Sequence, residues 1–306
     1  MSDVQEHAAR LIASFVSCCL WGILLTTFVP CISSLLFSAS QKFKFKPRRE
    51  IKFPVVAATT LLFLVSTCSA VLAIVDVMDA FIYYQGPGGA LEFFDTRNNG
   101  WKHWFLAVED TLQVTLGDAL LIYRCFVIYD RNWRAIAVPA VSWLAMAAMS
   151  ITASAREATL PGAKRLNDPS MIPVLSGTLV LTFTTSVITT YLIVRRLWRA
   201  EVQMSLRGVI QAHFLSRVAI VFFETGMIYT LSVIITLGIY LSGINLEYVA
   251  SLALIHIIPI TCNLLLIRVE RIPRSESPAD GSSGSPATMK SLSTEGKFNS
   301  KAMEEV

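Results

Sequence analysis

Seven long apolar stretches fill most of this 306-residue chain between positions 11 and 267. A helix needs about 20 predominantly apolar residues to cross the hydrocarbon core of a bilayer, and each stretch meets or nearly meets that length. A chain that is 54% hydrophobic and only 16% charged is also too apolar for an ordinary soluble domain. The sequence therefore predicts an all-α polytopic membrane protein, a bundle of seven transmembrane helices. The predicted spans are Leu11–Phe37, Val55–Val75 with an extension to Tyr84, Trp104–Tyr129, Ala135–Ala155, Met171–Val194, Val218–Leu241 and Val249–Ile267.

Basic residues between the spans predict the orientation of the bundle. Segments 38–54, 130–134 and 195–217, with the tail after Ile267, carry 19 Lys and Arg, whereas the opposite face carries 6. Short loops rich in Lys and Arg stay in the cytoplasm. We therefore expect the N-terminus outside and the C-terminus inside, most simply in the plasma membrane.

The two ends of the chain differ from the apolar middle. Residues 275–306 are rich in Ser, Gly and charge and contain almost no large apolar residues, so they cannot bury enough surface to fold alone. The predicted organisation is a short extracellular N-terminus over 1–10, a transmembrane domain over 11–270 and a disordered cytoplasmic tail over 271–306.

Four carboxylates are predicted to ring the outer end of two neighbouring helices: Asp76, Asp79, Glu109 and Asp110. Counting from the cytoplasmic boundary at about 1.5 Å per residue places them about 30–40 Å away, at the outer headgroup level. One interpretation is an acidic mouth that attracts a cationic or hydrogen-bonding ligand. The simpler alternative is an ordinary wetted rim, because carboxylates at interface depth cost little.

Polar residues deeper in the spans give the remaining candidates for ligand binding. Asp118 and His256 are both expected near the bilayer midplane, where ionisable groups usually face the bundle interior. We expect Asp118 to be hydrogen-bonded, with His256 as favoured partner because their depths match; separate bonds to nearby Thr, Ser or carbonyl groups are the alternative. The span that carries Gln113 and Asp118 is polar on both sides and should be central. Pro259 should kink its helix and free a carbonyl.

An ionic contact is predicted between Arg124 and Glu224 near the cytoplasmic end. Both are expected roughly 9–11 Å inside the membrane, where each would be costly alone. The contact could determine the fold only, or it could also hold a resting state.

One segment resembles a known family. The run from Gly117 to Phe126, Gly-Asp-Ala-Leu-Leu-Ile-Tyr-Arg-Cys-Phe, followed by Trp133 and Pro139, is similar to a segment of seven-span proteins from mushroom-forming basidiomycete fungi. The sequence His256–Asn263 is a weaker match. That family is described as receptor-like because of its topology, and no biochemical activity is assigned to it. The resemblance implies a shared fold and names no ligand.

Three classes of function follow from these features. A receptor would sense an extracellular or membrane-dissolved small ligand and could contact a cytoplasmic signalling protein through loops 38–54, 130–134 and 195–217. A small-molecule transporter or a structural, lipid-interacting membrane protein is the alternative. An enzyme is not expected, because three of the four His lie outside the core and no nucleophile–base set is evident. No cofactor or metal is expected, since the six cysteines fit no zinc pattern. The net charge of +4 indicates lipid headgroups rather than nucleic acid as partners.

Overall fold

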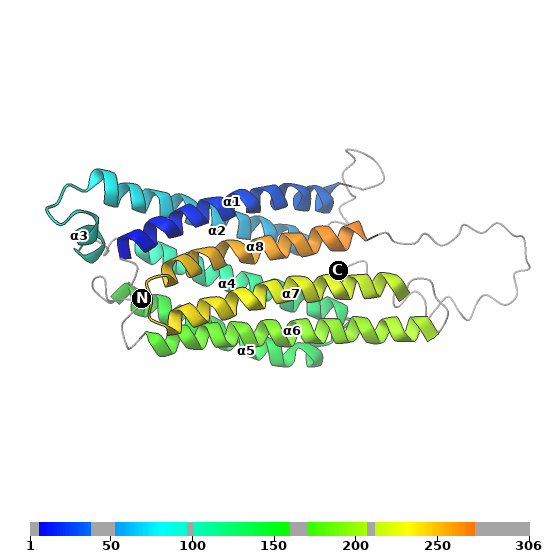
Figure 1. Ribbon diagram of the computed structural model, residues 1–306. Coiled ribbons are helices and arrows are strands. Elements are labelled where there is room, and N and C mark those ends of the chain that lie inside the picture. The colour runs from blue at the N-terminus through cyan, green and yellow to red at the C-terminus, as the bar shows by residue number, and fades with distance from the viewer. Residues whose placement is uncertain (1–5, 38–52, 97–100, 160–170, 207–211, 273–306) are drawn as a thin grey trace, which may run out of the picture.

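The computed structural model describes residues 6–37, 53–96, 101–159, 171–206 and 212–272, and its long elements are all helices (Figure 1). Seven of these helices are long and apolar enough to cross a membrane, which confirms the seven long apolar helices that the sequence predicts. The helices are α1 (Glu6–Leu36), α2 (Phe53–Met78), α3 (Gly89–Thr96), α4 (Trp101–Ile128), α5 (Trp133–Thr159), α6 (Ile172–Leu206), α7 (Ala212–Leu241) and α8 (Glu247–Arg271).

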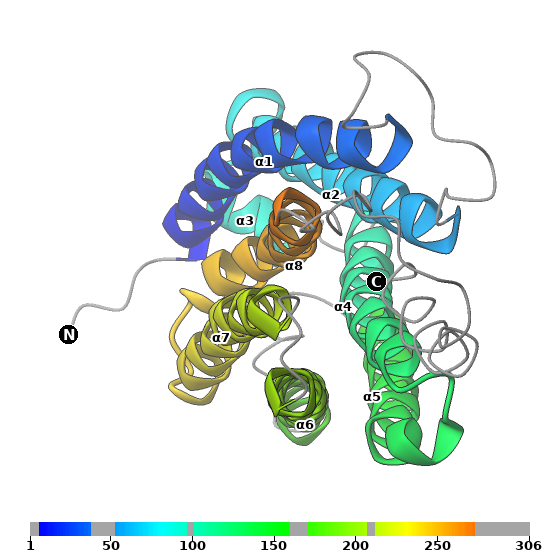
Figure 2. The same cartoon turned by 90° about the vertical axis from the view of Figure 1, so that its right-hand side faces the viewer.

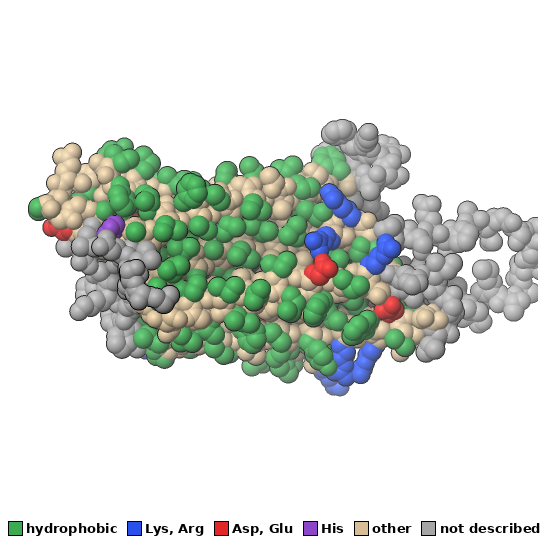
Figure 3. All heavy atoms as spheres, viewed as in Figure 1, with side chains coloured by type: hydrophobic (Ala, Val, Ile, Leu, Met, Phe, Trp, Pro, Cys, Tyr) green, Lys and Arg blue, Asp and Glu red, His purple; other side chains and the backbone are tan. Residues whose placement is uncertain are grey.

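Apolar side chains cover the long side of the bundle that Figure 3 shows. Large residues such as Phe15, Val141 and Ile235 are more than half exposed. A soluble protein rarely exposes a continuous apolar surface of this kind, whereas a bilayer makes it favourable. The seven apolar helices and this surface mark the chain as an integral membrane protein.

The two ends of the bundle differ in charge. We call the end that carries α3 the α3 end and the opposite one the basic end, because Lys and Arg gather there (Figure 3). The turn between α4 and α5 belongs to the basic end, where Asp130 forms an ion pair with Arg196 of α6 at 3.7 Å. The 35-residue helix α6 is about 52 Å long, far more than the roughly 30 Å hydrocarbon core requires. Together with the start of α7, it projects past the other helices at the basic end (Figure 1).

Helix α8 lies in the middle of the bundle (Figure 2), and α4 and α8 are the two most buried of the seven long helices. Helix α8 packs against α1, α2, α4 and α7, and α4 packs against α2, α5, α6 and α8. The prediction that the span with Gln113 and Asp118 is central is therefore confirmed. A helix with polar groups on opposite sides can satisfy both only when neighbours surround it.

Two local elements follow α2 at the α3 end. A π-helical turn, η1 (Asp79–Tyr83), continues α2 and confirms the expected extension of that span. The short helix α3 was not predicted. It folds back so that Phe93 and Phe94 pack with Ala80, Tyr84 and Ala90.

Several predictions fall on segments outside the described residues. These are half of the predicted N-terminus (1–5), most of the tail (273–306), most of loop 38–54 (38–52) and part of loop 195–217 (207–211).

Candidate functional site

A cavity of about 200 Å³ lies toward the α3 end of the bundle, and all seven long helices contribute to its lining. We call it the large cavity. Its walls are chiefly apolar, as in most small-molecule sites, with a few polar side chains among them. The charged residues that line it are Arg10, Asp76, Asp110 and Glu247.

Arg10 of α1 organises one wall of the large cavity. Its guanidinium lies 4.5 Å from the ring centre of Phe94 and 4.3 Å from that of Tyr248, so it is held between two aromatic faces. It also donates a hydrogen bond to the Tyr248 hydroxyl at 3.2 Å and forms an ion pair with Asp76 at 3.9 Å. These contacts tie α1 to α2, α3 and α8. Asp76 is therefore part of an ion pair and not a free rim carboxylate.

Hydroxyl groups supply the other polar features of the cavity wall. Thr111 of α4 and Ser154 of α5 share a hydrogen bond at 2.8 Å. Thr182 of α6 is 1% exposed, lines the cavity, and its hydroxyl has no hydrogen-bond partner among the described residues. Nearby threonines on the same helix, such as Thr178, donate to the carbonyl four residues earlier. Thr182 therefore retains a polar group that a ligand could use.

Pro259 frees a carbonyl beside the large cavity, as the sequence predicted. Proline has no N–H to donate to the carbonyl four residues earlier, which is that of Ile255. The Gln113 amide donates to this carbonyl at 3.0 Å, and the Ser66 hydroxyl donates to it at 3.4 Å. Gln113 also donates to Ser66 at 3.0 Å. This network joins α2, α4 and α8 with fully buried polar groups.

Asp118 lies farther along α4, about 12 Å from Asp110 toward the basic end. It is fully buried and accepts a hydrogen bond from the Tyr229 hydroxyl of α7 at 3.0 Å. The prediction that Asp118 faces the interior and is hydrogen-bonded is confirmed. The favoured partner was wrong, because Tyr229 and not His256 makes the bond.

His256 faces α1 instead of α4. Its Nδ1 lies 2.8 Å from the Leu252 carbonyl, which can only accept, so Nδ1 carries a proton. Its Nε2 lies 3.4 Å from the Ser17 hydroxyl. The rotation of α8 about its axis thus points His256 toward Ser17 and away from Asp118.

The other two predicted carboxylates lie apart from the large cavity. Asp79 begins the π-helical turn and is half-buried. Glu109 is 3% exposed, and neither carboxylate oxygen has a hydrogen-bond partner among the described residues. Of the seven predicted ligand-binding residues, the structure thus brings only Asp76 and Asp110 to the cavity wall.

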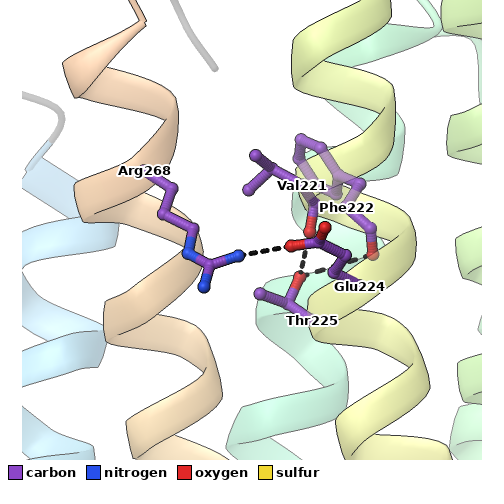
Figure 4. Close-up of polar contacts among 5 residues, drawn as sticks. All are labelled: Val221, Phe222, Glu224, Thr225 and Arg268. Atoms are coloured by element: carbon purple, nitrogen blue, oxygen red, sulfur yellow. Dashed lines mark hydrogen bonds and ion pairs between the residues drawn. The ribbon is translucent and has the colours of Figure 1, made fainter.

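The predicted contact between Arg124 and Glu224 is wrong. Glu224 is paired with Arg268 of α8 and is half exposed (Figure 4). Arg124 is 3% exposed, and its guanidinium has no hydrogen-bond partner among the described residues. Glu224 does lie level with Arg124, because its neighbours Phe222 and Thr225 border the same cavity as Arg124, but its side chain points to Arg268 instead.

Sequence reasoning missed Tyr229, Arg268 and the role of Arg10. Tyr229 carries a hydroxyl in the middle of an apolar span, and a buried tyrosine hydroxyl usually needs a partner. That signal could have marked it as a partner for Asp118. Among the described residues, no group of three His, Cys, Asp or Glu side chains is placed to hold a metal ion.

Comparison with protein-family models, curated proteins and solved structures gives no match for this chain. The similarity to the fungal seven-span family therefore stays a prediction from the sequence.

Proposed function

We propose that this chain is a receptor-like seven-helix membrane protein that binds a small ligand in the large cavity. The observation that carries the proposal is the position of that cavity at one end of the bundle. Between it and the basic end lie the buried Gln113–Ser66 network and the Asp118–Tyr229 bond. A ligand site at one end of the bundle, separated from the other end by packed polar side chains, suits a sensor better than a transporter, which needs a path through the bundle. The α4–α5 turn and the ends of α6 and α7 would then contact a cytoplasmic signalling protein.

The lining favours a ligand with an apolar body and one group that is positively charged or donates hydrogen bonds. Three carboxylates and one guanidinium line the described walls, and the Thr182 hydroxyl is available. An apolar cavity of about 150 Å³ accommodates benzene, so a cavity of about 200 Å³ suits a small molecule rather than a whole lipid.

Ligand binding is tested with the purified protein in detergent and a panel of small amphipathic amines with their uncharged analogues. We expect some amines to raise the unfolding temperature, since a ligand that binds only the folded state stabilises it. Ala153→Leu fills the cavity wall and should abolish the shift. Ala148→Leu, an exposed position on the same helix, is the matched control and should preserve it.

Signalling is tested in cells that express the chain beside a reporter for G-protein activation. An amine that shifts the unfolding temperature should also change the reporter signal, and Ala153→Leu should remove both effects. Accumulation of the same compound inside cells, without a reporter response, would favour a transporter instead.

The proposed orientation puts the α3 end outside and the basic end in the cytoplasm of the plasma membrane. Ser242 and Asn132 are exposed turn residues at the two ends of the bundle. A membrane-impermeant thiol reagent applied to intact cells should label Ser242→Cys and spare Asn132→Cys. The reverse pattern would invert the proposed topology.

A further inference from the structure

Arg124 is a buried charge at mid-bundle to which no group in the described part of the chain is hydrogen-bonded. Its side chain is 3% exposed, and Nε, Nη1 and Nη2 all have no hydrogen-bond partner among the described residues. An isolated guanidinium cannot lose its charge readily, and leaving it unpaired in an apolar interior costs several kcal/mol. Some group must therefore satisfy it.

A second cavity, of about 20 Å³, borders Arg124 and offers the space for that group. We call it the small cavity. A site of roughly 10–15 Å³ is enough to hold one water molecule if polar partners surround it. Its polar walls include Arg124, Thr190, Thr225, Tyr229 and Thr261. Because helical side chains lean toward the N-terminus of their helix, Arg124 leans toward Gly117 and Leu121, which line the same cavity.

The hydrogen bonds around the small cavity define what can occupy it. Thr225 donates to the Val221 carbonyl and Thr261 to the Ile258 carbonyl, both at 2.8 Å. Tyr229 donates to Asp118 at 3.0 Å. These three hydroxyls have therefore used their protons and present only acceptor lone pairs to the cavity. Arg124 presents only donors.

A water molecule fits this pattern, because it accepts from a guanidinium N–H and donates to a hydroxyl oxygen. An anion fits less well, since it could accept from Arg124 and from the Thr190 hydroxyl but would face the lone pairs of the other three hydroxyls. The carboxyl group of Asp118 also lies less than two helical turns away, and its Oδ2 has no partner among the described residues.

We propose that the small cavity binds water that joins Arg124 to Tyr229, and through Tyr229 to Asp118, as a water-bridged ion pair. The two charges of α4 then compensate each other although they are about 9 Å apart along its axis. The bridge passes through α7 by way of Tyr229, and Thr261 of α8 borders it. It therefore links three helices between the large cavity and the basic end.

The first test is a double-mutant cycle on thermal unfolding in detergent. Arg124→Met and Asp118→Asn should each lower the unfolding temperature by about 5 °C or more, because each leaves one charge uncompensated. The double variant should lose clearly less than the sum of the two losses. Tyr229→Phe should weaken this coupling, since it removes the connecting hydroxyl. The control is Asp118→Asn with Arg268→Gln, for which the losses should add. Additive losses for Asp118→Asn and Arg124→Met would overturn the proposal.

The second test needs no variant. A high-resolution map of the protein should show a solvent peak within hydrogen-bond distance of both the Arg124 guanidinium and the Tyr229 hydroxyl. Crystals grown in bromide should give no anomalous peak there. A bromide peak would assign the small cavity to an anion, and a direct bond from Arg124 to Asp118 would remove the need for a bridge. Either result would overturn the proposal.

Discussion

Arg10 and Arg124 are both largely buried arginines, but the fold satisfies them in different ways. Arg10 lies at the α3 end, where it contacts two aromatic rings, a hydroxyl and a carboxylate. Arg124 lies in the middle of the bundle beside a small cavity and has no direct partner among the described residues. Near the end of the bundle, tyrosine and aspartate can approach a guanidinium and still reach water. In the middle of the bundle bulk water is out of reach. Compensation of the Arg124 charge therefore depends on what occupies the small cavity beside it.

The largest effect is expected from Arg124→Met. The change removes a charge that we propose is compensated through water by Asp118, and breaking a buried pair costs about 3–5 kcal/mol. The free energy of unfolding, measured by denaturant titration in detergent, should fall by an amount in that range. A loss below about 1 kcal/mol would show that Arg124 is already satisfied by exposure to solvent.

Arg10→Met should cost less, about 2 kcal/mol, because cation–π contacts are each worth about 0.5–2 kcal/mol and the ion pair with Asp76 is long. Arg10→Lys is the matched control. It keeps the charge but loses planar stacking on Phe94 and Tyr248, so it should recover only part of the loss. If Arg10→Met proves more costly than Arg124→Met, the contrast between the two sites is reversed.

Gln113→Leu tests a neutral buried group that has a direct partner. The change leaves the Ile255 carbonyl with only the 3.4 Å contact from Ser66, and an unsatisfied carbonyl costs about 1–3 kcal/mol. In a Pro259→Ala background the new backbone N–H can bond that carbonyl, so the same change should cost less. Equal costs in the two backgrounds would mean that the freed carbonyl is not why Gln113 matters.

The smallest effect is expected from Arg268→Gln. Arg268 and Glu224 are about half exposed at the basic end, and exposed ion pairs contribute about 0–1 kcal/mol. Thermal unfolding of this variant should stay close to that of the wild-type protein. A loss comparable to that of Arg124→Met would place the Arg268–Glu224 pair inside the apolar core of the bilayer.

The seven long helices could be predicted from the sequence because crossing a bilayer imposes a length and a composition on each one. The short helix α3 could not. Its eight residues are too few to be stable alone, and the packing of Phe93 and Phe94 against Ala80 and Tyr84 stabilises it. The contact joins α3 to η1, and these two elements meet only because the turn between them brings them together.

The candidate site was only partly predictable, because residue counting gives the level of a side chain but not its direction. Asp118 and His256 were assigned similar depths, yet one faces α7 and the other faces α1. The same holds for Glu224, whose neighbours Phe222 and Thr225 line the small cavity with Arg124 while its own side chain points to Arg268. The freed carbonyl at Pro259 was predictable, since the chemistry of proline fixes it within one helix.

The extensive packing of α1 against α8 has a consequence for how the chain is assembled. Helix α1 leaves the ribosome before α8 and finds its principal neighbour only when α8 has been made. Until then Ser17 lacks His256, and Arg10 lacks Tyr248. Closure of the bundle is therefore a late event, and truncation before α8 should leave α1 exposed to the quality-control machinery of the cell.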